Sequence, residues 1–387
     1  MINKTQVIIV GGGPSGLLLA RLLHLHGIDC LVLERQSQSY VAERVRAGIL
    51  ESGTVDMLQL AGVAQRALKE GLFHDGLVLT YGQQQHRIDV KGLTGSQVLA
   101  YGQTEIQKDL IAATQGQVVW EAHDVALHDF YTDHPAVTFE FDGVTRRVDC
   151  DFIIGCDGYH GISRASVSPA DITVYERLLP VGWLGVLADA PPVSHEVVYA
   201  NHERGFALCS MRSPTRSRYY VQCPTTDSIE QWSDERFWQE LKSRLPDAIS
   251  SRLQTAPSIE KRIVPLRSFV AEPMRFGQLF LVGDAAHVVP PTGAKGLNLA
   301  VADVRLLFQA LTEHYQSQRD DLLDQYSSRA LARIWKATRF SWWLTQMTHR
   351  LSDEPMARRL QLAELDYIAQ SPAASKVVAE NYAGLWV

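Results

Sequence analysis

The chain has 387 residues, of which 46% are hydrophobic and 21% charged, enough to bury a large core in two or three domains. Its 37 basic and 43 acidic residues give a net charge of −6, so no basic surface for nucleic acid or an anionic membrane is expected. With no signal peptide, no apolar run of the roughly 18 residues that a membrane helix needs, and five cysteines without a CxxC pair, we expect a cytoplasmic protein.

The first predicted element is a βαβ unit typical of dinucleotide binding. An apolar strand at residues 6–10 precedes the turn GGGPSG at 11–16, and leucines at helical spacing follow in 17–26. A second strand at 28–33 ends at Glu34, whose carboxylate can accept hydrogen bonds from a ribose. The strand, turn, helix, strand and acid together indicate a nucleotide site.

Three glycines of this turn have separate roles in such a site. Gly11 allows the tight turn, Gly13 lets the backbone approach a pyrophosphate, and Gly16 lets the helix pack on the strand. The helix N-terminus offers free N–H groups and a positive dipole to the phosphates. Arg35 after the acid is compatible with a 2′-phosphate, so these residues leave both FAD and NAD(P) open.

Two later segments place aspartates at the tips of predicted strands. Residues 150–154 run into a turn that contains Asp157, and residues 279–282 run into a turn that contains Asp284. Each carboxylate could accept hydrogen bonds from sugar hydroxyls, although such Asp-Gly and Gly-Asp pairs are more often simple turns.

A helix is predicted to begin after the double proline at 290–291 and to continue through 301–311. Its N-terminus could stabilise negative charge on a flavin ring. Lys295, near the start of this helix, could equally be a solvated surface charge.

The segment 177–267 is rich in strand signals and predicts an antiparallel hairpin. Its expected strands are residues 196–200, 205–212 and 217–223. Ser210 and Arg212 lie two residues apart and therefore on one face, where Arg212 could hold a carboxylate by two hydrogen bonds. Spacing alone cannot distinguish Arg212 from the surface arginines nearby. Beyond the sheet, residues 326–350 carry an apolar stripe at helical spacing that is more often core than partner surface.

The cofactor segments occur in the order and approximate spacing of the flavin-dependent aromatic hydroxylases, the group A flavoproteins, and the chain resembles this family from residue 5 to residue 385. The resemblance implies an α/β fold with an FAD-binding βαβ (Rossmann-like) domain, an antiparallel β-sheet substrate domain and C-terminal helices. The implied limits are 1–177 for the first part of the FAD-binding domain, 178–267 for the substrate-binding sheet, 268–296 for the return segment of the FAD-binding domain, and 297–387 for the C-terminal helical and interface region.

The resemblance also assigns the nucleotide as FAD, with NADPH as a transient co-substrate. The FAD-binding residues that it implies are Gly11, Gly13, Ser15, Gly16, Glu34, Arg44, Arg46, Gln103, Asp157, Asp284, Gly296, Leu297 and Asn298. The NADPH-binding residues that it implies are Arg35, Tyr40, Arg44, His160 and Arg267. Neither position 35 nor position 40 carries an acid, which favours NADPH over NADH, although a solvated basic loop is a serious alternative for the cluster around them.

For the substrate, the resemblance implies a small aromatic acid held at both ends. The implied substrate-binding residues are Tyr199, Ser210, Arg212, Tyr220 and Pro291, and the implied catalytic residues are Tyr199, Tyr382, His74 and Pro291. Tyr199 takes the phenolic proton, Tyr382 and His74 link it to solvent, and the Pro291 carbonyl lies beside the substrate hydroxyl. From the sequence alone, the two tyrosines could be core aromatics and His74 a loop histidine.

The implied reaction is the hydroxylation of 4-hydroxybenzoate at the 3-position to 3,4-dihydroxybenzoate, with NADPH and molecular oxygen, through a flavin C4a-hydroperoxide. The same chemistry on 3-hydroxybenzoate, 4-aminobenzoate or salicylate stays open, because Arg212 indicates only a carboxylate. The absence of a CxxxxC pair disfavours a flavin disulfide reductase, and a flavin-containing redox sensor without turnover stays open. No metal is expected, since the sequence has no HxH, HExxH or Cys₄ pattern. The family also implies a homodimer.

Overall fold

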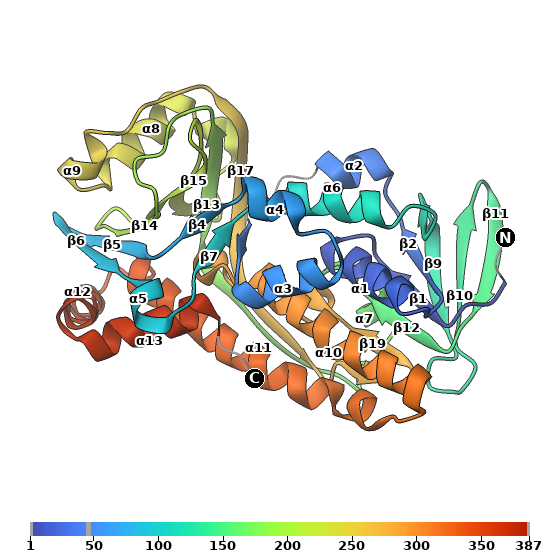
Figure 1. The fold of residues 1–387 in the computed structure, drawn as a ribbon. Helices are drawn as coiled ribbons and strands as arrows, with labels where there is room; N and C mark the ends of the chain where they lie inside the picture. The colour runs from blue at the N-terminus through green and yellow to red at the C-terminus, as the bar shows by residue number, and fades with distance from the viewer. Residues whose placement is uncertain (1–2, 44–47, 385–387) are drawn as a thin grey trace.

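The computed structural model describes residues 3–43 and 48–384, which form two sheet-based halves joined by long strands and flanked by C-terminal helices (Figure 1). The first half is built on a six-stranded sheet. Its order is β18 (Arg275–Phe276), β19 (Leu279–Leu281), β12 (Phe152–Gly155), β1 (Val7–Val10), β2 (Cys30–Glu34) and β8 (Val118–Trp120). All its pairs are parallel except β18 with β19. The predicted βαβ unit is confirmed.

The second half is built on an eight-stranded sheet. Its order is β20 (His287–Val288), β17 (Ser258–Glu272), β13 (Thr173–Ala188), β16 (Arg216–Pro224), β15 (Ala207–Ser213), β14 (Val197–Asn201), β5 (Leu77–Tyr81) and β6 (Gln84–Ile88). The predicted hairpin is confirmed by the antiparallel pairs of β15 with β14 and β16. Two strands from the N-terminal third, β5 and β6, also join this sheet, and β5 pairs with β14 in parallel. The domain limits given above stay a prediction.

Two small sheets and the helices complete the described residues. The small sheets are β11 (Val144–Asp149), β10 (Ala136–Phe141) and β9 (His123–His128), and β3 (Ile49–Leu50), β7 (Val98–Ala100) and β4 (Leu72–His74). The α-helices are α1 (Pro14–Leu25), α2 (Gln38–Glu43), α3 (Ser52–Leu60), α4 (Gln65–Glu70), α5 (Val90–Thr94), α6 (Gln103–Ala113), α7 (Ile162–Ala165), α8 (Asp234–Ser243), α9 (Asp247–Ser250), α10 (Gly296–Ser317), α11 (Asp321–Thr348), α12 (Pro355–Gln370) and α13 (Pro372–Ala383). The 3₁₀ helices are η1 (Ile229–Gln231), η2 (Gly283–Ala285) and η3 (Pro291–Gly293).

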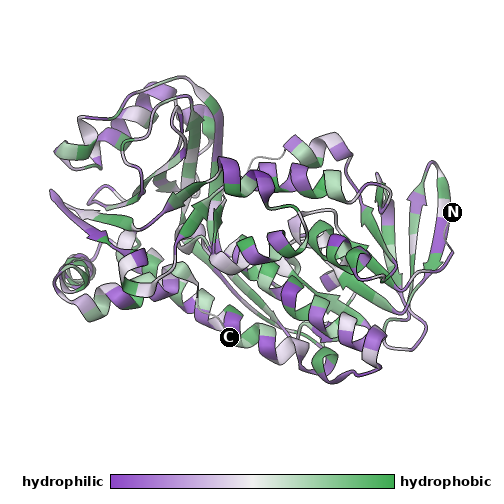
Figure 2. Ribbon diagram, viewed as in Figure 1, coloured by the Kyte–Doolittle hydropathy of each residue, from purple (hydrophilic) through white to green (hydrophobic). Residues whose placement is uncertain are grey.

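The apolar residues form three clusters that follow these layers. The first joins the six-stranded sheet to α1 and α10, the second lies between the eight-stranded sheet and α11–α13, and the third lies between that sheet and α8 and α9. Figure 2 shows the same division, with hydrophobic residues concentrated along the central strands and the inward faces of the helices. Tyr199 and Tyr382 both belong to the second cluster, which therefore contains the candidate substrate site.

The structure bears on what the sequence indicated about the cysteines, the apolar stripe at residues 326–350 and membrane-spanning helices. The five cysteines are all free thiols. The apolar stripe of α11 is mostly core, since Ile334 and Thr338 are buried, although Trp335 is 39% exposed. Among the described helices, none combines the length and the apolarity that crossing a bilayer requires.

Candidate active site

The glycine-rich turn between β1 and α1 has the shape of a phosphate cradle. Gly11 has a φ of +111°, and a Cβ there would lie 2.4 Å from the Cys156 carbonyl oxygen. A Cβ on Gly16 would lie 2.0 Å from the carbonyl oxygen of Gly11, so neither position accepts a side chain. At Gly13, in contrast, a Cβ would meet no atom within 4 Å, and no side chain caps the helix that follows. This open helix N-terminus fits the pyrophosphate of FAD.

Glu34 and Gln107 fix the same turn from two sides. The Glu34 carboxylate, at the end of β2, accepts hydrogen bonds from the backbone N–H groups of Gly12 at 2.7 Å and Gln36 at 2.8 Å. The side chain of Gln107, on α6, donates to the Gly12 carbonyl at 2.7 Å and is buried. Gln103, also expected at the cofactor, is the first residue of α6. Gln107 belongs to no motif, so nothing in the sequence selects it.

Asp157 lies just after the end of β12, as expected, and one of its two carboxylate oxygens has no hydrogen-bond partner among the described residues. Its Oδ2 accepts from the backbone N–H of Ser163 at 2.8 Å, whereas Oδ1 is buried without a hydrogen-bond partner in the described part of the chain. Burial raises the pKa of this carboxyl. A buried acceptor without a partner is costly, so the position is suited to a donor from a bound group.

The turn that carries Asp284 is held by a buried ion pair on the far side. The Asp303 carboxylate, on α10, accepts from the backbone N–H of Gly283 at 2.9 Å and from Nε2 of His287 at 2.6 Å. Asp303 is 2% exposed and His287 is 1% exposed. Burial disfavours charge on His287, but the Asp303 carboxylate outweighs this and raises the pKa of the imidazole. One carboxylate thus joins the turn, β20 and α10.

The N-terminus of α10 also has no side-chain cap. Its first residues are Gly296, Leu297 and Asn298. The Asn298 side chain accepts from Glu51 N and Thr54 Oγ1, and it donates to the carbonyls of Ile49 and Ala294. Because both its donors and acceptors are used, this residue has only its backbone N–H left for a cofactor.

Lys295 is not the solvated surface charge that the sequence left open. It is 3% exposed, and its Nζ donates to Glu51 Oε1 at 2.6 Å and to the carbonyl oxygen of Tyr382 at 2.9 Å. The other Glu51 oxygen accepts from Arg333 Nη2 at 2.7 Å. The physical reason for the burial is the Glu51 carboxylate, which comes from a distant part of the chain. The ion network also anchors the backbone of the predicted catalytic Tyr382.

The eight-stranded sheet provides an unpaired cation at the predicted carboxylate end of the site. Arg212 lies on β15, its Nη1 is buried without a hydrogen-bond partner, and the Oγ of Ser210 on the same face is likewise unpartnered among the described residues. Burial lowers the pKa of Arg212, while contact with the Tyr220 hydroxyl opposes this. A buried guanidinium stays charged at neutral pH and needs an anionic partner. The predicted role of Ser210, Arg212 and Tyr220 in binding a carboxylate fits these unpartnered donors and stays a prediction.

The neighbouring arginines already have acidic partners, which the sequence could not reveal. Arg204 pairs with Glu240, Arg216 with Asp189 at 2.7 Å, and Arg218 with Glu260 at 2.9 Å. In the described ranges, no carboxylate pairs with Arg212. Only the tertiary structure selects Arg212 from this group.

The phenol end of the site contains two buried tyrosines. Tyr199, on β14, donates from its hydroxyl to the Thr292 carbonyl at 2.9 Å, and its ring meets that of Tyr382 edge to face with centroids 6.4 Å apart. The Tyr382 hydroxyl has no hydrogen-bond partner within residues 3–43 and 48–384. Burial raises the pKa of Tyr382 to about 12, and burial together with Tyr382 raises the pKa of Tyr199 well above its ordinary value. The carbonyl of Pro291 accepts from Ala294 N in the adjoining turn, so its contact with a substrate hydroxyl stays a prediction.

His74 lies inside the protein rather than at its surface. It is 0% exposed, and neither ring nitrogen has a hydrogen-bond partner among the residues described. Burial, helped by His195 and Arg212, lowers its pKa to about 4, so it is neutral at pH 7. It therefore does not reach solvent directly, in contrast to the expected role as the solvent end of the chain.

The residues expected at NADPH fall into two groups. His160 and Arg267 both contact Tyr159, with ring centroids 4.8 Å apart for the histidine and the guanidinium 4.2 Å from the ring centre for the arginine. Arg35, after β2, and Tyr40, on α2, are exposed. Arg44, which was predicted for both cofactors, lies outside the described residues, as does Arg46, which was predicted for FAD. The NADPH site stays a prediction.

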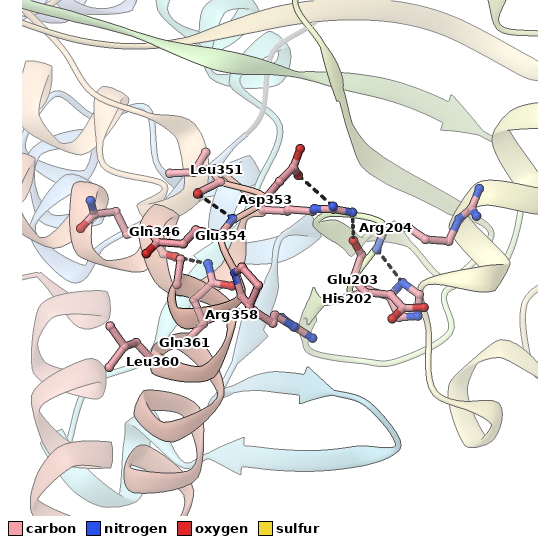
Figure 3. A pocket seen from close by; sticks show the side chains of 14 residues that line it. His202, Glu203, Arg204, Gln346, Leu351, Asp353, Glu354, Arg358, Leu360 and Gln361 are labelled. Carbon is pink, nitrogen blue, oxygen red and sulfur yellow. Dashed lines mark hydrogen bonds and ion pairs between the residues drawn. The ribbon is translucent and has the colours of Figure 1, made fainter.

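A surface pocket of about 660 Å³ lies elsewhere, between the β14–β15 turn and the start of α12 (Figure 3). Its polar groups bond to one another: Arg350 pairs with the Asp353 side chain and donates to the backbone carbonyl of Glu203, and Gln361 donates to the backbone carbonyl of Gln346. None of the predicted site residues lines it. The predicted site at Tyr199, Tyr382 and Arg212 is therefore separate from this pocket.

Comparisons with known proteins agree with this geometry. Residues 4–341 match the FAD binding domain family. The chain is 54% identical to p-hydroxybenzoate hydroxylase of Acinetobacter baylyi over 99% of this chain and 96% of that protein. It is 26% identical to the 3-(3-hydroxy-phenyl)propionate/3-hydroxycinnamic acid hydroxylase of Mycobacterium sp. (strain JLS), over 84% of this chain and 57% of that protein.

Among solved structures, p-nitrophenol 4-monooxygenase PnpA from Pseudomonas putida DLL-E4 superposes with a TM-score of 0.85. The match covers 100% of both chains at 18% sequence identity, so it bears on the fold alone. The chain therefore belongs to the FAD binding domain family, as one of its flavin-dependent aromatic hydroxylases.

Proposed function

We propose that the protein hydroxylates 4-hydroxybenzoate at carbon 3 to give 3,4-dihydroxybenzoate, using FAD, NADPH and molecular oxygen. The observation that carries this proposal is the pairing of Arg212, whose Nη1 is buried without a hydrogen-bond partner among the described residues, with two buried phenols, Tyr199 on the same sheet and Tyr382 on α13. A benzoate ring with a carboxylate at one end and a hydroxyl at the other matches these two ends.

The strand register supports this placement. Tyr199 pairs with Leu208 on β15, and Leu208 pairs with Tyr220 on β16, so the two tyrosines lie on one face, two strands apart. Strands are about 4.8 Å apart, which separates the phenol end from the carboxylate end by roughly 10 Å of backbone. Side chains that reach inward from both ends can hold one aromatic ring between them. A ring whose carboxylate and hydroxyl are para to each other places one group at each end of this site.

In the proposed mechanism, Arg212 and Ser210 bind the carboxylate and fix the direction of the ring. FAD, when bound, activates oxygen with the two electrons that NADPH supplies. Tyr199 accepts the proton of the substrate hydroxyl as it passes its own hydroxyl proton on toward Tyr382, and the resulting phenolate has more electron density at its ortho carbon than the phenol. The surrounding apolar side chains exclude water from the reacting atoms.

The same chemistry on 3-hydroxybenzoate, 4-aminobenzoate or salicylate is the alternative. Oxygen consumption with NADPH and each of these acids, followed by product identification, tests the proposal. We expect 4-hydroxybenzoate to accelerate NADPH oxidation most and to yield 3,4-dihydroxybenzoate. If another acid gives the only hydroxylated product, the substrate assignment is wrong. If no acid accelerates NADPH oxidation, the monooxygenase assignment is wrong.

We also propose that the enzyme acts as a homodimer in the cytoplasm. Five free thiols suit a reducing compartment. Met356, Leu360 and Tyr367 on α12 are each at least 60% exposed, which leaves apolar surface for a second copy. Sedimentation of the FAD-loaded protein tests the dimer, and a monomer at micromolar concentration would refute it.

A further inference from the structure

A second histidine lies between His74 and solvent. The rings of His74 and His195 have centroids 5.4 Å apart, with an angle of 55° between their planes. His74 is fully buried, whereas His195 is exposed. A proton that reaches His74 therefore meets an exposed imidazole next.

The sheet topology explains why two histidines from distant parts of the chain meet. Strands β5 and β14 are parallel, and Leu77 pairs with Val197 at their starts. His195 lies two residues before Val197, and His74 lies three residues before Leu77. Both side chains are thus brought to the same edge of the sheet. Tyr199, the proposed proton acceptor, is on β14 itself, four residues after His195.

A carboxylate at the same edge of the sheet also affects the pKa of Tyr382. Glu196, next to His195, raises the pKa of Tyr382 as a secondary cause after burial. Its carboxylate is held by Arg87, with bonds of 2.9 and 2.7 Å. The charged and titratable groups around the histidine pair are Asp75, Arg87, Lys91, Glu196 and Arg212. Asp75 is paired with Lys91 and Gln97, and Glu196 with Arg87, which leaves the two imidazoles as groups that can accept a proton at one ring nitrogen and donate one from the other.

We infer that His195 is the outer member of the proton path, a relay residue that acts through His74 and exchanges protons with solvent. This inference rests on the proposed function. One proton leaves the substrate hydroxyl for Tyr199, each following group accepts one proton and passes one on, and water receives one from His195. Every side chain ends in its starting state, and the bound substrate is left as a phenolate.

The test is the rate of proton release when 4-hydroxybenzoate binds to the oxidised, FAD-loaded enzyme without NADPH. A pH-indicator dye in weakly buffered solution reports this release in a stopped-flow instrument. We expect His195→Gln to slow release at least tenfold, with the Kd of the substrate within twofold of the parent. Added imidazole should restore the rate in proportion to its concentration, because a small base can replace the missing exchange group.

The matched control is His123→Gln, which removes an exposed histidine from β9 in the other half of the molecule and should leave release unchanged. An unchanged rate in His195→Gln overturns the inference. If His195→Gln slows proton release and added imidazole does not restore the rate, the inference is also overturned, because that result indicates a structural role for His195. If the parent enzyme binds 4-hydroxybenzoate but releases no proton, the relay is wrong, whereas failure to bind it refutes the proposed function instead.

Discussion

Tyr199 and Tyr382 meet edge to face, with ring centroids 6.4 Å apart, although one lies on a strand of the eight-stranded sheet and the other on the last helix. Tyr199 is held by the Thr292 carbonyl at 2.9 Å, whereas the Tyr382 hydroxyl is unpartnered in the described part of the chain. The pair is thus fixed at one member and open at the other, which suits the transfer of a proton from a bound phenol.

Replacing Tyr199 by Phe should uncouple the reaction. The variant keeps the ring but loses the group that accepts the substrate proton, so the ring stays a less reactive phenol. NADPH oxidation should continue, while the yield of hydroxylated product per NADPH falls at least tenfold and hydrogen peroxide appears. Product and peroxide are measured in the same reaction. Tyr367→Phe, at a 60% exposed position, is the control, and full product yield in Tyr199→Phe would contradict the assignment.

Replacing Arg212 by Ala should weaken binding of the aromatic acid by about 2–5 kcal/mol, the usual cost of removing one partner of a buried charge pair. Titration of the FAD-loaded protein with 4-hydroxybenzoate gives the Kd. Arg216→Ala is a matched control in the same hairpin, because Arg216 is paired with Asp189 at the surface. Equal affinities for the two variants would show that Arg212 does not bind the carboxylate.

Replacing Asp303 by Asn should weaken FAD binding roughly tenfold or more. A tenfold loss corresponds to about 1.4 kcal/mol of binding free energy. The carboxylate holds both Gly283 N and His287, and an amide lacks the negative charge that raises the pKa of this imidazole. FAD release during dilution, followed by flavin fluorescence, measures the effect. Asp324→Asn, at a 71% exposed side chain, should retain FAD normally. Parent-like retention in Asp303→Asn would disprove the positioning role.

His349 should make the protein sensitive to acid. It is buried, accepts from Trp183 Nε1 at 2.6 Å, and burial lowers its pKa to about 3. Between the ordinary histidine pKa of about 6.5 and this value, the unfolded chain binds a proton that the folded chain does not. Stability is therefore highest above about pH 6.5 and falls as pH drops, by up to ~1.4 kcal/mol per pH unit.

Urea unfolding of the parent and of His349→Gln between pH 4 and 7 measures this slope. The variant should be less stable at pH 7, because the stacked contact with Phe206 at 4.1 Å is changed, but its stability should depend less on pH. His134→Gln, at an exposed position, should keep the parent slope. Identical slopes in all three proteins would show that His349 does not titrate on unfolding.

The local patterns of the chain were sufficient for the nucleotide half of the fold. The glycine turn, the leucine spacing of α1 and the acid at Glu34 lie within a short segment, and local backbone sterics and burial decide their structure. The hairpin of β15 and β16 was predicted for the same reason. The fold of the substrate half could be predicted less fully from the sequence. Strands β5 and β6 join its sheet through the parallel pairing of β5 with β14, and no local sequence pattern indicates that pairing.

The sequence by itself thus determined the βαβ nucleotide turn, the hairpin and the residue types available for an aromatic acid. Only the tertiary structure decided that Lys295 is buried against Glu51, that Arg212 differs from Arg204, Arg216 and Arg218 in having no acidic partner among the described residues, and that His74 lies behind His195. The physical reason is that desolvation and ion pairing depend on groups that meet through packing, and their separation along the chain does not record which of them meet.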